Sequence, residues 1–186
     1  MAVLPLGSQR ADYSPEMKDI ANRFDVLDAR ITSWMARHGL LLLRISLGIV
    51  FLWFGALKFF PGLSPAHDLA ARTIEVLSFG TVHAGVSIPL LASWECLIGL
   101  GLLFGIFMRA TLLLLAVQMA GTLMPLVLFP GEVFTRIPYA PTLEGQYIIK
   151  NAVLISAAIV LGATVRGGGL TAKRGSEPLS SPPRAT

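Results

Sequence analysis

The sequence predicts an all-α integral membrane protein, a bundle of four transmembrane helices with an N-terminal amphipathic helix at the membrane interface. Of its 186 residues, 54% are hydrophobic and 14% are charged, and the mean hydropathy is +0.68. A soluble domain carries about 25% charged residues, so this composition suits lipid better than water. Several apolar runs also approach the length of about 20 residues that one membrane crossing needs. The Lys and Arg residues are dispersed around those runs rather than gathered into a patch, which argues against nucleic acid as a partner.

The N-terminal segment, residues 1–38, is predicted to contain a helix that begins near Pro15, because proline is favoured in the first helical turn. Apolar side chains recur along it at helical spacing, opposite a charged face. These apolar residues are Met17, Ile20, Phe24, Leu27, Ile31 and Trp34. We expect this helix to lie on the cytoplasmic membrane surface, with packing against a partner or against the loops of the bundle as the alternative.

Residues 39–165 are predicted to form the transmembrane domain, with Pro125 kinking the third span because proline removes a backbone hydrogen bond. The four predicted spans are residues 39–60, 89–107 and 110–129, and a final segment that ends at Val165.

Local signals predict how the remaining segments begin and end. Ser87 is the expected N-cap of the second span, and Thr142 that of the fourth, where Glu144 suits the positive end of the helix. A short interfacial or re-entrant helix is expected between residues 64 and 83. The glycines, serines and prolines of residues 166–186 predict a disordered cytoplasmic tail.

The distribution of Lys and Arg predicts that both termini are cytoplasmic, since cytoplasmic loops carry an excess of these residues. Only Arg72 and Arg136 fall on the opposite, outer side. The residues on the cytoplasmic side are Arg10, Lys18, Arg23, Arg30, Arg37, Arg109, Arg166, Lys173, Arg174 and Arg184. An even number of spans agrees with this count, and the expected location is the bacterial inner membrane.

Cysteine and histidine usage limits the redox chemistry that one chain could hold. Cys96 is the single cysteine, so no disulfide, dithiol pair or thiolate-rich metal site is expected. The three histidines, His38, His67 and His83, fall at or beyond predicted helix ends, which argues against a bis-histidine haem inside the bundle. We therefore predict no metal site and no intrinsic cofactor.

Glu95 is the most informative residue, because a carboxylate inside a membrane helix costs a few kcal/mol unless it is paired or protonated. At about 1.5 Å per residue, it lies roughly 9 Å from the outer end of the second span, and Lys150 lies roughly 12 Å into the fourth from the same side. Lys58 approaches from the end of the first span. Three ionisable groups can therefore converge in the outer half of the bundle, with Glu144 nearby at the start of the fourth span.

Two interpretations of this polar cluster remain open. It can fix helix packing, for example by pairing Glu95 with Lys150, or it can form a site for a proton, an anion or a quinone. Trp94, Gln118 and Asn151 could support such a site, although each alone is typical of helix packing or interface anchoring. Gly101 and Gly105 form a GxxxG pattern, which permits close helix approach.

The sequence resembles the DoxX-like membrane proteins, including their YkgB-related branch. The resemblance rests on the segments FGALKF (54–59), Trp94-Glu95 and TLEGQYIIKN (142–151), and it covers about residues 40–165. It implies a four-helix inner-membrane protein, associated in some members with quinone-linked sulfur oxidation or terminal oxidase complexes and in others with oxidative-stress defence. Its marked positions are Lys58, Glu95, Glu144 and Lys150.

Three functions are compatible with these observations. The leading hypothesis is an accessory or anchoring subunit of a quinone-linked membrane oxidoreductase or oxidative-stress complex, rather than a stand-alone enzyme. In that case redox-protein subunits are partners and quinone is the one cofactor considered. A second is a small proton- or anion-coupled transporter, which with four helices per chain requires a homo-oligomer or a very small solute. A third is a membrane scaffold without chemistry.

Overall fold

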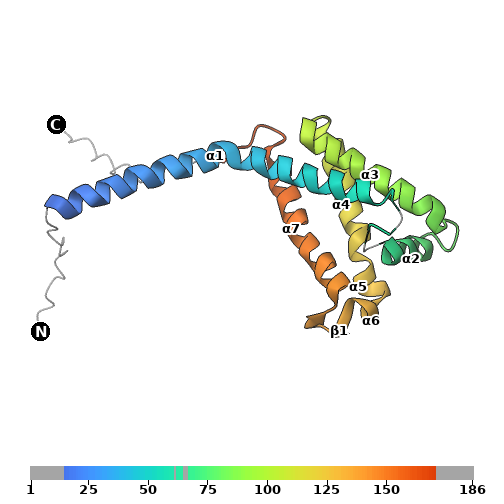
Figure 1. Ribbon diagram of the computed structural model, residues 1–186. Helices are drawn as coiled ribbons and strands as arrows, with labels where there is room; N and C mark the ends of the chain where they lie inside the picture. Colours follow the sequence, from blue (N-terminus) through green and yellow to red (C-terminus); the bar gives the residue numbers. More distant parts are fainter. Residues whose placement is uncertain (1–14, 61, 65–66, 171–186) are drawn as a thin grey trace, which may run out of the picture. The chain divides into compact units, whose positions relative to one another are not determined.

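The computed structural model describes residues 15–60, 62–64 and 67–170 (Figure 1). In chain order its elements are α1 (Pro15–Leu57), α2 (His67–Leu77), α3 (Ala84–Phe104), α4 (Met108–Leu123), α5 (Pro125–Leu128), α6 (Pro130–Val133), β1 (Phe134–Arg136), β2 (Ala140–Pro141) and α7 (Leu143–Thr164). Within these described residues, four helical segments are long and apolar enough to cross a membrane: Asn22–Leu57, Ala84–Phe104, Met108–Leu128 and Leu143–Thr164. The predicted all-α membrane bundle is therefore confirmed.

The chain divides into two compact units, one formed by residues 1–39 and 170–186 and the other by residues 40–169. In the first unit the structure describes the N-terminal portion of α1. The predicted N-terminal start and most of the predicted tail, residues 1–14 and 171–186, lie outside the described residues. The amphipathic helix and the first span, which the sequence suggests as separate helices, belong to the single helix α1, because a lone glycine such as Gly39 costs a helix only about 1 kcal/mol.

Two predicted helix boundaries are wrong. α3 begins at Ala84, after an extended His83 that makes no side-chain cap hydrogen bond, so Ser87 lies buried inside the helix instead of capping it. The turn between the second and third spans is also earlier than Met108-Arg109. α3 ends where Gly105 adopts a left-handed conformation with φ of 68°, which glycine reaches without strain.

Two other local predictions are confirmed. α4 ends at Leu123, and the helical path resumes at Pro125 as the separate short helix α5, so the proline interrupts the third span. Thr142 caps α7, because its hydroxyl oxygen accepts a hydrogen bond of 3.2 Å from the backbone N–H of Gly145.

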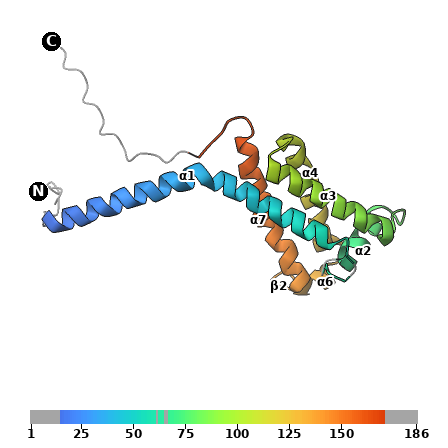
Figure 2. The same cartoon turned by 45° about the horizontal axis from the view of Figure 1, so that its top comes forward.

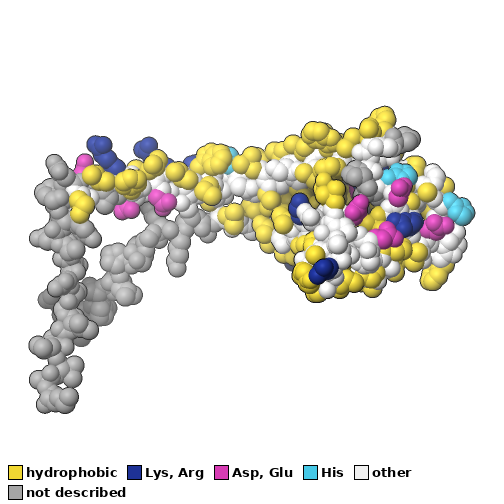
Figure 3. Space-filling view, turned by 60° about the horizontal axis from the view of Figure 1, so that its bottom comes forward, with side chains coloured by type: hydrophobic (Ala, Val, Ile, Leu, Met, Phe, Trp, Pro, Cys, Tyr) yellow, Lys and Arg dark blue, Asp and Glu magenta, His cyan; other side chains and the backbone are white. Residues whose placement is uncertain are grey.

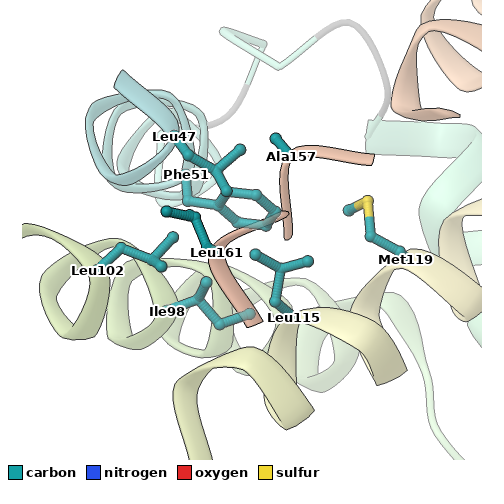
Figure 4. Close-up of a cluster of buried hydrophobic side chains, with 8 residues drawn as sticks. All are labelled: Leu47, Phe51, Ile98, Leu102, Leu115, Met119, Ala157 and Leu161. Carbon is teal, nitrogen blue, oxygen red and sulfur yellow. The ribbon is translucent and has the colours of Figure 1, made fainter. Parts of the chain in front are cut away.

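The core of the second unit draws its side chains from all four spans. Figure 4 shows them converging, with Phe51 of α1 directed toward side chains of the other helices. The buried members are Leu47 and Phe51 from α1, Ile98 and Leu102 from α3, Leu115 and Met119 from α4, and Ala157 and Leu161 from α7. Burial inside the bundle fixes the rotation of each span and so determines which polar residues can meet.

A second, smaller core lies at the end of the bundle where α7 begins, and it joins α2, α6 and α7 through Leu69, Val133 and Ile148. The strands β1 and β2 pair antiparallel there, with Phe134 opposite Pro141. Figures 1 and 2 show α2, α6 and the strands gathered at this end. Charged side chains also gather on this face (Figure 3), whereas the flanks of the unit are largely hydrophobic.

Candidate functional site

Glu95 lies at the centre of a buried polar cluster that joins three spans. Its carboxylate oxygen Oε2 lies 2.5 Å from the Lys58 ammonium, and both side chains are 10% exposed. The other oxygen, Oε1, accepts a hydrogen bond of 2.9 Å from the side-chain amide of Gln118. Lys58 directly follows α1, Glu95 belongs to α3 and Gln118 to α4. One oxygen of the carboxylate is thus held by the residue that follows α1 and the other by a residue of α4, an arrangement we call the Lys58–Glu95–Gln118 cluster.

Close packing of α1 on α3 makes the Lys58–Glu95 contact possible. A Cβ atom at Gly55 would lie 2.8 Å from the Cβ of Glu95 and 3.0 Å from the backbone nitrogen of Cys96. Only glycine leaves room for these backbones at this separation. Lys58 follows Gly55 by three residues, about one helical turn, and its side chain therefore reaches across to Glu95.

The cluster retains hydrogen-bonding capacity after its internal contacts are made. A lysine ammonium has three donors. One is used by Glu95 and another by the carbonyl oxygen of Phe54 at 3.4 Å, and in the described part of the chain the third makes no hydrogen bond. The amide oxygen of Gln118 also accepts none there. The cluster can therefore offer a charged donor and a neutral acceptor to a ligand that carries a carbonyl or hydroxyl group.

Lys150 does not join the cluster. Its side chain is exposed on α7, and its ammonium lies 5.6 Å from the ring centroid of Tyr147. The predicted convergence of three ionisable groups is therefore wrong for Lys150, and the partner of Glu95 is Lys58. Glu144 is likewise exposed, in the first turn of α7, and forms no ion pair with a described residue. Equal depth in the membrane brings side chains together only if their helices are rotated to face one another.

The three predicted supporting residues differ in their surroundings. Gln118 is 7% exposed and is part of the cluster. Trp94 packs against the main core and donates from its indole nitrogen to the carbonyl oxygen of Leu114 at 3.2 Å, so it links α3 to α4. Asn151 is half-buried on α7, and its side chain makes no hydrogen bond within the described ranges.

An ion pair that the sequence analysis missed lies at the α2 end of the bundle. Arg72 of α2 donates two hydrogen bonds to Glu132 of α6, at 2.7 and 2.5 Å, and its guanidinium lies 5.5 Å from the ring centroid of Phe129. Bidentate Arg–carboxylate pairing is specific in geometry. The partners are 60 residues apart in the chain, and no local pattern indicates such a pair.

The Arg72–Glu132 pair is expected to stabilise the α2 end near neutral pH, where Glu132 is ionised, and to lose this effect in acid. The hydrogen bond from Arg72 lowers the pKa of Glu132 below its ordinary value of 4.5 and raises the pKa of Arg72. A carboxyl group with a lowered pKa contributes stability above its unfolded pKa, and this contribution is lost as the pH falls through its folded pKa.

The measurement is the thermal unfolding midpoint in mild detergent as a function of pH, for the wild type and for Glu132→Gln. The wild type should be slightly more stable near neutral pH, and the difference should vanish in acid. A difference that is constant across this range would contradict the ionic contribution.

Metal ligands do not cluster in the described part of the chain, where no three or more His, Cys, Asp or Glu side chains are placed to hold an ion together. Cys96, half-buried beside Glu95 in α3, is a free thiol.

Comparison with known proteins gives one match. The family model described as DoxX matches residues 39–129, which include the last part of α1, the adjoining Lys58, and helices α2, α3 and α4. All three members of the Lys58–Glu95–Gln118 cluster fall inside the matched region. No curated protein and no solved structure matches the chain.

Proposed function

Because this chain belongs to the DoxX-like family of multi-pass membrane proteins, we propose that it is an accessory subunit of a quinone-linked oxidoreductase or oxidative-stress complex in the bacterial inner membrane. In this proposal the bundle offers a quinone-facing site, and a partner subunit supplies the redox centre. The excess of Lys and Arg at one end of the spans supports cytoplasmic termini. The cluster would then lie toward the outer half of the membrane.

The observation that carries the proposal is the unused hydrogen-bonding capacity of the Lys58–Glu95–Gln118 cluster. A quinone carbonyl accepts hydrogen bonds, and a hydroquinone hydroxyl also donates them. The third ammonium proton of Lys58 could donate a hydrogen bond to a quinone carbonyl, and the amide oxygen of Gln118 could accept one from a hydroquinone hydroxyl. If the cluster served only to pack helices, these two groups without partners would add nothing to stability, because unpaired polar groups are costly in a membrane.

Four exposed aromatic side chains lie within five residues of Lys58 in the sequence and would give a lipid-soluble ring a surface to approach. Trp53 is 65% exposed, Phe54 is 53% exposed, and Phe59 and Phe60 are 49% and 58% exposed. Aromatic rings pair through offset or edge-to-face contacts, which suit a flat quinone head group. A quinone could thus reach Lys58 laterally from the bilayer without a closed pocket in the bundle.

The proposal assigns electron transfer to another protein because this sequence has few ligands for a redox centre. It contains one cysteine and three histidines. The role left to the bundle is to bind and orient the quinone and to anchor the partner. Glu95 would hold Lys58 in place, since its Oε2 lies within hydrogen-bond distance of the ammonium.

The test is mass spectrometry of the tagged protein purified at native levels in mild detergent, scoring quinones and redox subunits against an unrelated four-helix protein. We expect quinone enrichment in the wild type and its loss in Lys58→Met/Glu95→Leu. Lys150→Met is the matched control, because it also removes a membrane lysine but leaves the cluster intact. We expect this variant to retain quinone.

A wild-type preparation without quinone and without redox subunits would overturn the proposal. Transport would then be the next hypothesis to test, by measuring proton or anion flux in vesicles that contain the wild type or Glu95→Gln.

A further inference from the structure

The N-terminal portion of α1 carries an apolar stripe whose spacing alternates strictly between three and four residues. From residue 17 to residue 37 this gives three complete heptads with an apolar residue at every a and d position. These side chains are all exposed by half or more: Met17 50%, Ile20 54%, Phe24 67%, Leu27 53%, Ile31 50% and Trp34 51%. Six large apolar side chains in one seam are thus exposed along the N-terminal portion of α1.

The outward-facing positions of the same heptads are mostly polar, charged or small rather than large and apolar. Apart from Val26, positions b, c and f hold polar, charged or small residues, among them Asp19, Asn22 and Asp25. A strict a and d seam of period 3.5 is the pattern of a coiled coil.

Charges beside the seam indicate which partner helix fits it and whether the two helices run parallel or antiparallel. Arginine occupies the g position of each heptad, at Arg23, Arg30 and Arg37, and Asp28 occupies an e position. In a parallel pair, a g residue faces the e residue of the following heptad on the other helix, so Arg23 faces Asp28 of a second copy. In an antiparallel pair the g positions face each other, which would set arginines against arginines. The charge pattern therefore favours a parallel pair of identical chains.

A lipid surface is the competing occupant of this stripe. Helices that bind anionic membranes are rich in Lys and Arg on the polar face. Between residues 17 and 37 this chain has four basic and three acidic residues, so electrostatic attraction to anionic lipid is weak. Two copies inserted with the same topology also carry this segment on the same side of the membrane, as a parallel pair requires.

We propose that residues 17–37 form a parallel two-stranded coiled coil with a second copy of this chain, which makes the protein a homodimer. The apolar stripe then covers its own equivalent, and two symmetric contacts between Arg23 and Asp28 flank the seam. This inference is independent of quinone binding, because it involves neither Lys58 nor Glu95.

Disulfide cross-linking in native membranes tests the pairing. Leu27→Cys places a thiol at a d position, where equivalent residues of a parallel pair come within the Cα separation of about 4.4–6.8 Å that a disulfide needs. Asn22→Cys is the matched control at an f position, where the thiols would be roughly two helix diameters, about 20 Å, apart. The parent chain, with Cys96 alone, gives the baseline.

We expect roughly tenfold more covalent dimer from Leu27→Cys than from Asn22→Cys, because only the first thiol lies in the seam. Labelling with a maleimide under reducing conditions confirms that both thiols are reactive. Equal cross-linking of the two variants at the level of the parent would overturn the proposal and favour the lipid surface.

A charge exchange provides a second test that cross-linking efficiency does not affect. Arg23→Glu should lower the dimer fraction, measured by counting subunits of fluorescently labelled protein in membranes, because it sets like charges against each other. Arg23→Glu/Asp28→Arg should restore it.

The intrachain contact of Arg23 with Asp19, at 3.5 Å, is lost in both variants. Restoration by the double variant therefore reports the contact between chains. A double variant no more dimeric than Arg23→Glu would contradict a parallel pair.

Discussion

Truncation of Glu95 to alanine is expected to lower the free energy of unfolding by about 3–5 kcal/mol, the usual cost of removing one partner of a buried ion pair. The substitution leaves the Lys58 ammonium without its counter-charge at a side chain that is 10% exposed. It also removes the acceptor of the Gln118 amide. The measurement is reversible unfolding in mild detergent or bicelles, with Glu144→Ala as the control. Glu144 is exposed and outside the cluster, so its removal should cost only the favourable interaction with the N-terminus of α7, about 1 kcal/mol or less.

Replacing both charges should recover most of the stability that Glu95→Ala loses. In Lys58→Met/Glu95→Leu no buried charge remains, and apolar replacement of a buried ion pair is often neutral or stabilising. This variant also separates the two interpretations of the cluster, because it is expected to fold and yet lose quinone. If Glu95→Ala were as stable as the wild type, the ion pair could not be present as described.

The second large effect is expected at the crossing of α1 and α3, where Gly99→Ala should destabilise the protein. A Cβ atom at Gly99 would lie 2.5 Å from the backbone nitrogen of Leu52 and 2.8 Å from its Cα. Backbone atoms cannot yield as the end of a flexible side chain can, so the two helices must separate. Overpacking of this kind costs about 1–3 kcal/mol, and separation would also weaken the contact between Lys58 and Glu95.

Gly121→Ala is the matched control for Gly99→Ala. Gly121 also lies in a membrane helix, but an added Cβ atom would meet nothing within 4 Å. Because alanine favours helix by about 1 kcal/mol over glycine, Gly121→Ala should be neutral or slightly stabilising. Both variants can be compared by thermal unfolding in the same detergent. Equal stability of the two would show that α1 and α3 do not cross closely at Gly99.

The four spans could be predicted from the sequence because each is a long apolar run, and lipid leaves few alternatives to a helix there. Thr142 as the cap of α7 and Pro125 as a break were predictable for a similar reason, since both act on the nearest backbone groups. The prediction of Ser87 as an N-cap was wrong because a serine can also be buried inside a helix, as Ser87 is in α3.

The choice of partner for Glu95 could not be predicted, because depth in the membrane follows from counting residues, whereas contact also depends on helix rotation. Successive residues turn by about 100° around a helix, so Lys150 can share the depth of Glu95 and face elsewhere. The positions at which the helices pack most closely could not be predicted from the sequence either. The GxxxG pattern at Gly101 and Gly105 was visible, yet the closest α1–α3 approaches use Gly55 and Gly99. Gly101 instead packs against Thr111 of α4.

Photolabelling with an azido-quinone in native membranes, followed by peptide mass spectrometry, most directly tests whether the Lys58–Glu95–Gln118 cluster binds quinone. We predict label on peptides from the end of α1 and from the parts of α3 and α4 that carry Glu95 and Gln118. The label should be lost in Lys58→Met/Glu95→Leu and retained in Lys150→Met. Label spread over all lipid-facing helices, or unchanged when the cluster is replaced, would contradict quinone binding at this site.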